Sequence, residues 1–307
     1  MKKAALAVVG ALLMLVGVVG LILPILPGWP ILFFGLSLIA PKLAERLKKR
    51  LFRKFFKSDI ATLDEWKKSR VLAGFTTKKF PLFLQKTDDL LKEENQRRFT
   101  ELFSPKENDS SRGRMTKFVV LGQTHGDGVA VLDNPSKYSK EGFYPVPACD
   151  AAMTNLPGLT LLVFSADCLP IFFLAGSWIA LAHAGWKGTE QKIARKTLRL
   201  LLEKSGCRPK SVKIIFGPSI SQRHYTVGKE FYDYFPASSL RYFGKGADRS
   251  PHFDLAGENR RQLVKSKVPA DNITDYQICT VDENENFYSF RKEKDNAGRI
   301  ISFIQKY

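Results

Sequence analysis

The chain has 307 residues and a net charge of +18, with ten basic and only two acidic residues in its first 60 positions. This length accommodates one large domain with an appendage. The positive charge is typical of proteins that bind nucleic acid or anionic membranes, but no basic run is interleaved with aromatic residues, which disfavours nucleic acid. Four cysteines without disulfide-framework spacing indicate reduced thiols in a cytosolic setting rather than a disulfide scaffold.

The first 40 positions predict a membrane segment. Residues 4–40 carry no charged side chain, and Ala4–Leu23 is about as long as the helix that crosses a bilayer core of roughly 30 Å. Prolines and a glycine at positions 24–30 then break the helix. Ile31–Ala40 continues apolar, and a basic amphipathic stretch, Lys42–Lys57, follows.

Two topologies fit this pattern. In a single pass, the basic stretch anchors the following chain in the cytoplasm. In a hairpin, helices at about 4–23 and 31–45 meet at the proline-rich turn, and both basic ends lie on the cytoplasmic side. We favour the hairpin, because it satisfies the positive-inside rule twice. A cleaved signal peptide is disfavoured, because no Ala-x-Ala site follows the first apolar run. We therefore expect an inner-membrane protein with residue 60 onward in the cytoplasm.

From residue 60 the pattern becomes that of a mixed α+β domain. Helices are expected where apolar residues recur at helical spacing, and strands where short apolar runs end in turn residues. The expected strands are 71–77, 118–121, 129–132, 160–165, 171–174, 178–183, 212–216, 287–291 and 299–304, and the expected helices are 88–103 and 190–204. Strands and helices do not alternate regularly, which favours α+β over α/β.

Three short segments combine into a predicted metal site. They are Gln-Thr-His-Gly around His125, Ser-Ala-Asp-Cys-Leu-Pro around Cys168, and Ala-His-Ala-Gly-Trp-Lys-Gly around His183. Two imidazoles and one thiolate form a three-ligand zinc set, and the open fourth position is the one that a catalytic zinc needs for water. Residue type alone also permits a loop histidine, a buried cysteine and a strand-end histidine.

The flanking residues resemble the laccase-domain family, also called the multicopper polyphenol oxidoreductase or YfiH-type family. The matching segments occur in family order from about residue 70 to the C-terminus: QTHGDGV, CDAAMTNLPG, SADCLPI, ALAHAGWKG, FGPSISQRHYTVG and ENFYSFRKEKDNAGRIISFI. The resemblance implies a β-sandwich of mixed sheets with helices outside, and zinc bound by His125, Cys168 and His183. The apolar N-terminus resembles small bacterial inner-membrane proteins with a PGPGW-like turn. The expected domains are a membrane hairpin with a basic juxtamembrane helix at 1–58 and a catalytic domain at 60–307.

Further site residues come from the matched segments. Asp150 is expected to act as an acid/base or to bind the substrate base, with a loop-capping role as the alternative. Asp167 either orients an imidazole or only closes a turn. His224 is expected to contact substrate, unless it is merely a turn histidine. Cys168 and His183 count as catalytic residues as well as ligands.

Two cations are the expected phosphate ligands. Lys187 follows the His183 motif and provides a point charge, and Arg291 lies in the matched FYSFR segment, where a surface salt bridge is its alternative role. The chain departs from the family pattern in three places: the early Ser-Leu-Asn-Leu-Gly segment is absent, the Asn-Arg pair is Asn95-Gln96, and Thr226 replaces a usual Glu. These changes affect the nucleoside or phosphate subsite and leave the three metal positions intact.

The resemblance implies a zinc-dependent purine nucleoside enzyme. Such an enzyme carries out phosphorolysis of adenosine, inosine and methylthioadenosine, and deaminates adenosine. One alternative is a non-catalytic, membrane-anchored zinc module, in which His224 or Asp150 supplies a fourth ligand. A copper-dependent polyphenol oxidoreductase ranks lower, because one mononuclear site with a single cysteine has too few ligands for a multicopper centre. The expected partners are purine nucleosides, phosphate and membrane lipid, and no nucleic acid.

Overall fold

The structure is a computed structural model that describes residues 58–103, 115–243 and 250–307, together with Ala11 and Met14. The chain divides into two compact units, Met1–Ser58 and Asp59–Tyr307. The predicted membrane hairpin and basic helix lie outside the described residues and stay a prediction. Within the described ranges, no helix combines the length and apolar character that a membrane crossing requires.

One mixed sheet forms the first layer of the larger unit. Its strand order is β1-β2-β14-β7-β3-β5, with parallel pairing only where β3 joins β7 and β5. The strands are β1 (Ile60–Thr62), β2 (Val71–Thr76), β14 (Ile300–Lys306), β7 (Leu159–Ser165), β3 (Lys117–Leu121) and β5 (Gly142–Val146). Every residue of β7 is buried, as expected of a strand covered on both faces.

A second mixed sheet packs against the first and carries the strands that later define the site. Its order is β13-β10-β8-β9-β6-β4, and the central β8, β9 and β6 pair antiparallel. The strands are β13 (Ile273–Asp275), β10 (Lys213–Phe216), β8 (Leu169–Ala175), β9 (Trp178–Ala184), β6 (Ala151–Thr154) and β4 (Val129–Leu132). A small separate ribbon pairs β11 (Leu240–Tyr242) with β12 (Pro251–Phe253).

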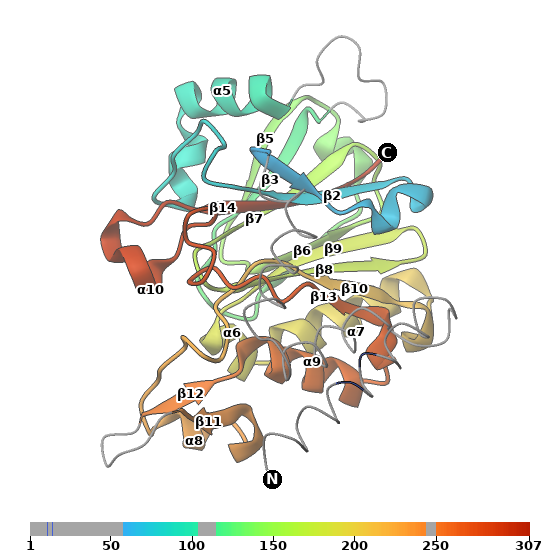
Figure 1. Cartoon of the computed structure of the whole chain (residues 1–307). Coiled ribbons are helices and arrows are strands. Elements are labelled where there is room, and N and C mark those ends of the chain that lie inside the picture. The colour runs from blue at the N-terminus through green and yellow to red at the C-terminus, as the bar shows by residue number, and fades with distance from the viewer. Residues whose placement is uncertain (1–10, 12–13, 15–57, 104–114, 244–249) are drawn as a thin grey trace. The chain divides into compact units, whose positions relative to one another are not determined.

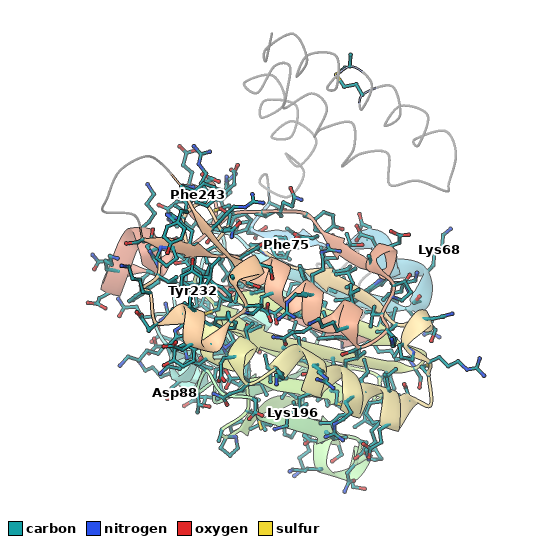
Figure 2. All side chains as sticks on the ribbon, turned by 90° about the horizontal axis from the view of Figure 1, so that it is seen from below. Lys68, Phe75, Asp88, Lys196, Tyr232 and Phe243 are labelled. Atoms are coloured by element: carbon teal, nitrogen blue, oxygen red, sulfur yellow. The ribbon has the colours of Figure 1, made fainter. Side chains whose placement is uncertain are left out.

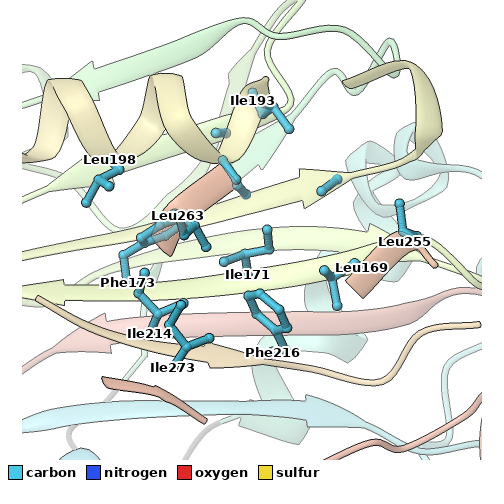
Figure 3. Packing of buried hydrophobic residues seen from close by; sticks show 14 of the residues in the cluster. Leu169, Ile171, Phe173, Ile193, Leu198, Ile214, Phe216, Leu255, Leu263 and Ile273 are labelled. Atoms are coloured by element: carbon cyan, nitrogen blue, oxygen red, sulfur yellow. The ribbon is translucent and has the colours of Figure 1, made fainter. Parts of the chain in front are cut away.

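Helices cover the outer faces of this β-sandwich. Figure 1 shows α5 (Glu93–Phe103) beyond the first sheet and α7 (Ile193–Ser205) and α9 (Leu255–Lys265) beyond the second. Figure 2 shows α7 and α9 side by side on that face. Apolar side chains of both helices pack on β8 and β10 (Figure 3). The short helices are α6 (Trp186–Glu190), α8 (Phe231–Tyr234) and α10 (Phe290–Glu293).

The α+β prediction is confirmed, with local differences. The predicted strand 287–291 is wrong, because this segment leads into helix α10. The Ser289 side chain accepts a hydrogen bond from the backbone N–H of Lys292 and caps the helical turn. The predicted helix at 88–103 is a 3-10 turn, Thr87–Leu91, followed by α5. The sequence patterns did not predict helix α9 or the strands β1, β5, β6, β11, β12 and β13. These strands are short or lie at sheet edges.

We expect Phe99→Ala in α5 to destabilise the larger unit by about 3–5 kcal/mol. Phe99 is fully buried, stacks on Phe103 with ring centroids 4.3 Å apart, and meets Phe118 edge to face at 5.2 Å. Phe83→Ala is the matched control: Phe83 is 53% exposed, so we expect a loss below about 1.5 kcal/mol. Urea unfolding followed by tryptophan fluorescence measures both, and equal losses would contradict this packing.

Candidate metal centre and active site

The structure brings the three predicted metal ligands together. One ligand atom each of His125, Cys168 and His183 lies within 4.8 Å of the others. His183 is buried, Cys168 is intermediate and His125 is exposed. The group is therefore anchored in the protein on one side and open to solvent on the other.

The second sheet positions two of these ligands. Cys168 directly precedes β8, and His183 lies near the end of β9, where it pairs in register with Pro170. Antiparallel pairing thus places the start of β8 and the end of β9 at the same edge of the sheet. The backbone N–H of His183 also donates to the carbonyl of Asp150, which directly precedes β6 (2.7 Å). Three neighbouring strands converge on the site.

Asp150 connects the turn that carries His125 to the ring of His183. Its carboxylate accepts three successive backbone N–H groups, those of Thr124, His125 and Gly126, at 2.9, 3.0 and 2.9 Å. The same carboxylate accepts from the Thr124 hydroxyl and pairs with Nδ1 of His183 at 2.8 Å. Successive N–H groups around an anion form a backbone nest. The nest holds His125 at a φ of +60°, a conformation that few non-glycine residues adopt.

Two further details hold the ligands close together. The side-chain amide of Gln123 pairs with both backbone groups of Phe164 at 2.8 Å, which connects the His125 turn to the end of β7 that leads to Cys168. Gly185 leaves the space between ligands open: a Cβ there would lie 3.1 Å from Cys168 Sγ and 3.1 Å from His125 Cδ2. A larger residue at position 185 would push into the ligand group.

The electrostatics of the group favour a charged pair. Burial alone would raise the pKa of the Cys168 thiol, but the positive charge of His183 and hydrogen bonds from both histidines lower it to about 6. Burial alone would lower the pKa of His183, but the Cys168 thiolate and Asp150 raise it to about 9. Without a metal, a thiolate and an imidazolium therefore face each other between about pH 6 and pH 9.

This donor set fits a metal ion. A thiolate is the form in which cysteine binds metals. Asp150 engages Nδ1 of His183, which leaves Nε2 directed to the ligand group, the arrangement usual for metal-bound histidines. Asp150 itself receives five hydrogen bonds, so its oxygens are occupied by donors and orient the ligands. This geometry favours an orienting role for Asp150 over the predicted acid/base role.

Asp167 lies beside the site, but it does not orient an imidazole. It is buried at a φ of +88°, and its carboxylate accepts from the Thr280 hydroxyl at 2.5 Å and from the backbone N–H of Arg291 at 2.6 Å. The Arg291 guanidinium donates two N–H groups to the carbonyl of Thr226 and lies over the Tyr225 ring, 5.4 Å from its centroid. Asp167 thus fixes the backbone of the predicted anion ligand next to Cys168.

The other two predicted substrate residues, His224 and Lys187, are not part of the ligand group. His224 belongs to a separate group with Cys279 and Asp282, so it is not a fourth ligand of the first group. Lys187 is exposed on α6, with its Nζ 5.6 Å from the Trp186 ring centroid. Lys187 follows Gly185, which adjoins Cys168 and His125, by two positions.

Several residues near the site were not predicted. Gln123 and Thr124 stand in the matched Gln-Thr-His-Gly segment, which was the available signal, but their partners are distant in sequence. The half-buried Arg299 lies within range of the Cys168 charge; burial lowers its pKa, and Cys168 and Asp89 oppose that shift. Burial raises the pKa of Tyr225, and the negative charge of Cys168 adds to the effect, which places this phenol near the ligands.

Comparison with known proteins identifies the family. Residues 94–306 match the family described as multi-copper polyphenol oxidoreductase laccase. The chain therefore belongs to this family, as its motifs predicted. Residues 3–54 match a second family, described as putative transmembrane protein (PGPGW).

Relatives carry names of purine nucleoside enzymes. Purine nucleoside phosphorylase YlmD of Bacillus subtilis is 32% identical over 197 residues, which cover 62% of this chain and 71% of that protein. Adenosine deaminase RL5, from an unknown prokaryotic organism, is 32% identical over 196 residues, or 61% and 74% of the two chains. Among solved structures, YlmD of Geobacillus stearothermophilus has a TM-score of 0.66 at 26% identity and covers 81% of this chain and 97% of its own. The hypothetical protein YfiH of Bacillus licheniformis has a TM-score of 0.69 at 25% identity, covering 82% and 98%.

The lowered pKa of Cys168 predicts that this thiol is alkylated at a lower pH than an ordinary cysteine. The thiolate is the reactive form, so in metal-free protein iodoacetamide labelling of Cys168 should rise through a midpoint near pH 6. Cys149 is the internal control, because burial and Asp150 raise its pKa. His183→Ala should move the Cys168 midpoint to higher pH. Mass spectrometry of the labelled peptides measures all three, and a shared midpoint for the two thiols would contradict the ion pair.

The nest predicts that Asp150→Asn weakens metal binding by roughly 10–100-fold, since an amide nitrogen cannot accept the N–H groups that the lost oxygen accepts. Asp127→Asn is the matched control: Asp127 lies in the same turn, but its carboxylate pairs with Lys196 at 2.7 Å on the surface. Competition with a chelator measures both affinities. Equal affinities for the two variants would refute the orienting role of Asp150.

Proposed function

We propose that this chain is a zinc-dependent purine nucleoside enzyme, acting on adenosine, inosine and methylthioadenosine by phosphorolysis and on adenosine by deamination. The observation that carries the proposal is the open three-ligand group of His125, Cys168 and His183. The names of the relatives, purine nucleoside phosphorylase and adenosine deaminase, support the substrate class. A catalytic zinc site typically has three protein ligands and an open position.

Phosphorolysis requires an anion site beside the sugar. A phosphate oxygen bonds to C1′ while the bond from C1′ to the purine nitrogen breaks; its electron pair leaves with the purine, which takes up a proton. The chain supplies three cations for this step: Arg291, Lys187 and Arg299. Arg291 is the strongest of these, because Asp167 and the Thr226 carbonyl fix its backbone and its side chain, while a guanidinium retains further N–H donors.

Deamination requires an activated water at C6 of the purine. A zinc ion at the three ligands would supply Lewis acidity that activates water at neutral pH. The protein's own contribution is positional: Asp150 fixes the His183 ring, and the nest fixes the His125 turn. His125 is exposed, so substrate reaches the group from that side.

The geometry disfavours the non-catalytic zinc module as the main function. A structural zinc normally has four protein ligands. The two expected sources of a fourth ligand do not complete this group: Asp150 accepts from backbone N–H groups and pairs with His183 Nδ1, and His224 lies in a separate group with Cys279 and Asp282. We therefore keep this module as the alternative that a lack of turnover would favour.

Copper chemistry is the second alternative, because the family description refers to copper and two imidazoles with one thiolate also suit copper. Oxidation of phenols by dioxygen passes four electrons to each dioxygen, however, and one mononuclear copper carries one electron at a time. We therefore rank zinc above copper. Metal analysis of the purified chain distinguishes the two.

We further propose that the chain is held at the inner membrane by its first 58 residues, with the catalytic unit facing the cytoplasm. The match of residues 3–54 to a putative transmembrane family supports this. The basic residues of 42–57 favour the cytoplasmic side. Reduced cysteines also suit that compartment.

The activity prediction uses the zinc-loaded full-length chain with adenosine, inosine and methylthioadenosine, each with and without phosphate. Chromatography of free bases, sugar phosphates and inosine separates phosphorolysis from deamination. Cys168→Ser and His183→Ala should each lower the activity roughly 100-fold or more. Mutating a residue that merely orients a metal ligand already costs about 10–100-fold in metal affinity or activity. Cys207→Ser, a thiol away from the ligand group, should keep full activity.

Arg291→Ala should raise the KM for phosphate more than the KM for nucleoside. Arg223→Ala is the control, since Arg223 is an exposed cation in the turn that precedes Thr226.

If wild-type chain with one zinc bound turns over none of the three nucleosides, with or without phosphate, the enzyme proposal fails and the anchored module replaces it.

A further inference from the structure

A second group of metal-binding side chains lies outside the proposed active site. One ligand atom each of His224, Cys279 and Asp282 lies within 4.8 Å of the others. Nε2 of His224 is 2.7 Å from Oδ1 of Asp282. The three donors are an imidazole, a thiol and a carboxylate, the three side-chain types that bind zinc in proteins. None of the three belongs to the first group.

Backbone hydrogen bonds between two segments build this group. The N–H of Ser219 donates to the carbonyl of Ile278, and the N–H of Thr280 donates to the carbonyl of Ser219, both at 3.1 Å. These bonds place the His224 segment beside Cys279. The N–H of Glu283 then donates to the carbonyl of Cys279 at 2.9 Å, which closes one helical turn. Residues three apart on a helical turn lie on the same side, so this turn brings Asp282 next to Cys279.

The burial of the three side chains suits a cation bound at the surface. Cys279 is 6% exposed, the His224 side chain 29% and the Asp282 side chain 52%. The sulfur thus lies inside, and the carboxylate faces solvent, so a metal has an entry path and room for water. Three ligands with a water in the fourth position is a usual zinc arrangement.

We propose that His224, Cys279 and Asp282 form a second binding site for a divalent zinc-class cation. The site is separate from the proposed active site, and its occupancy does not depend on whether the chain turns over nucleosides. It adjoins that active site: the Thr280 hydroxyl binds Asp167, which precedes Cys168, and Tyr225 follows His224. A cation there would hold together the two segments that carry Tyr225 and Asp282.

The test is a titration of metal-free full-length chain in detergent with Co²⁺, followed by Zn²⁺. Cobalt bound to a cysteine thiolate gives a near-ultraviolet charge-transfer band that reports each sulfur ligand. We expect two thiolate-bound cobalt ions per wild-type chain, one in Cys168→Ser and one in Cys279→Ser. The double variant should show no such band. Cys207→Ser is the control and should keep two.

Two more variants guard against a loss of folding. Asp282→Asn and His224→Ala change partly exposed residues, and each is made in the Cys168→Ser background, where only the proposed second site remains. We expect each to weaken the remaining cobalt site by about 10-fold or more. His252→Ala in the same background should leave it unchanged, because His252 belongs to neither ligand group. A wild-type chain that saturates at one thiolate-bound cobalt, with no thiolate band left in Cys168→Ser, would overturn the proposal.

Discussion

The candidate active site depends on one buried carboxylate. Asp150 has two oxygens, and between them they accept the backbone of the His125 turn, the Thr124 hydroxyl and the ring of His183. A buried charge is costly unless it is fully hydrogen-bonded, and the nest supplies those bonds. The same bonds set the unusual backbone of His125 and the orientation of the His183 ring. A single ionised group therefore aligns two of the three proposed metal ligands.

The β-sandwich makes this convergence possible. Asp150 and Cys168 directly precede β6 and β8, and His183 lies in β9, the strand between them in one sheet. Gln123 joins the His125 turn to the backbone of the other sheet. Rigid strands thus hold turns that lie far apart in the sequence. Both groups of potential metal ligands are built in such turns. Function in this fold resides where the strands end rather than in the apolar layers between them.

Some of this could be predicted from sequence and some could not. The three proposed ligands His125, Cys168 and His183 lie in short family motifs, so the sequence predicts them without a structure. The role of Asp150 depends on how many donors surround its oxygens, which no local pattern records. The expected strand at 287–291 was wrong because tertiary contacts outweighed an aromatic-rich pattern: Asp167 takes the N–H of Arg291, and Ser289 caps a helical turn. His224 was expected to contact substrate because it lies in the matched GPSISQRHYTVG segment. Its neighbours Cys279 and Asp282 lie more than 50 positions away, so no local pattern shows them.

The central claim is a metal held by two imidazoles and one thiolate with an open fourth position. X-ray absorption on the Cys279→Ser chain loaded with one equivalent of zinc tests it most directly, because that variant removes the sulfur of the second group. The account predicts one sulfur at about 2.3 Å, two imidazole nitrogens at about 2.0–2.1 Å and one further light atom. A zinc shell without sulfur, or one with three or more imidazoles, would contradict the account.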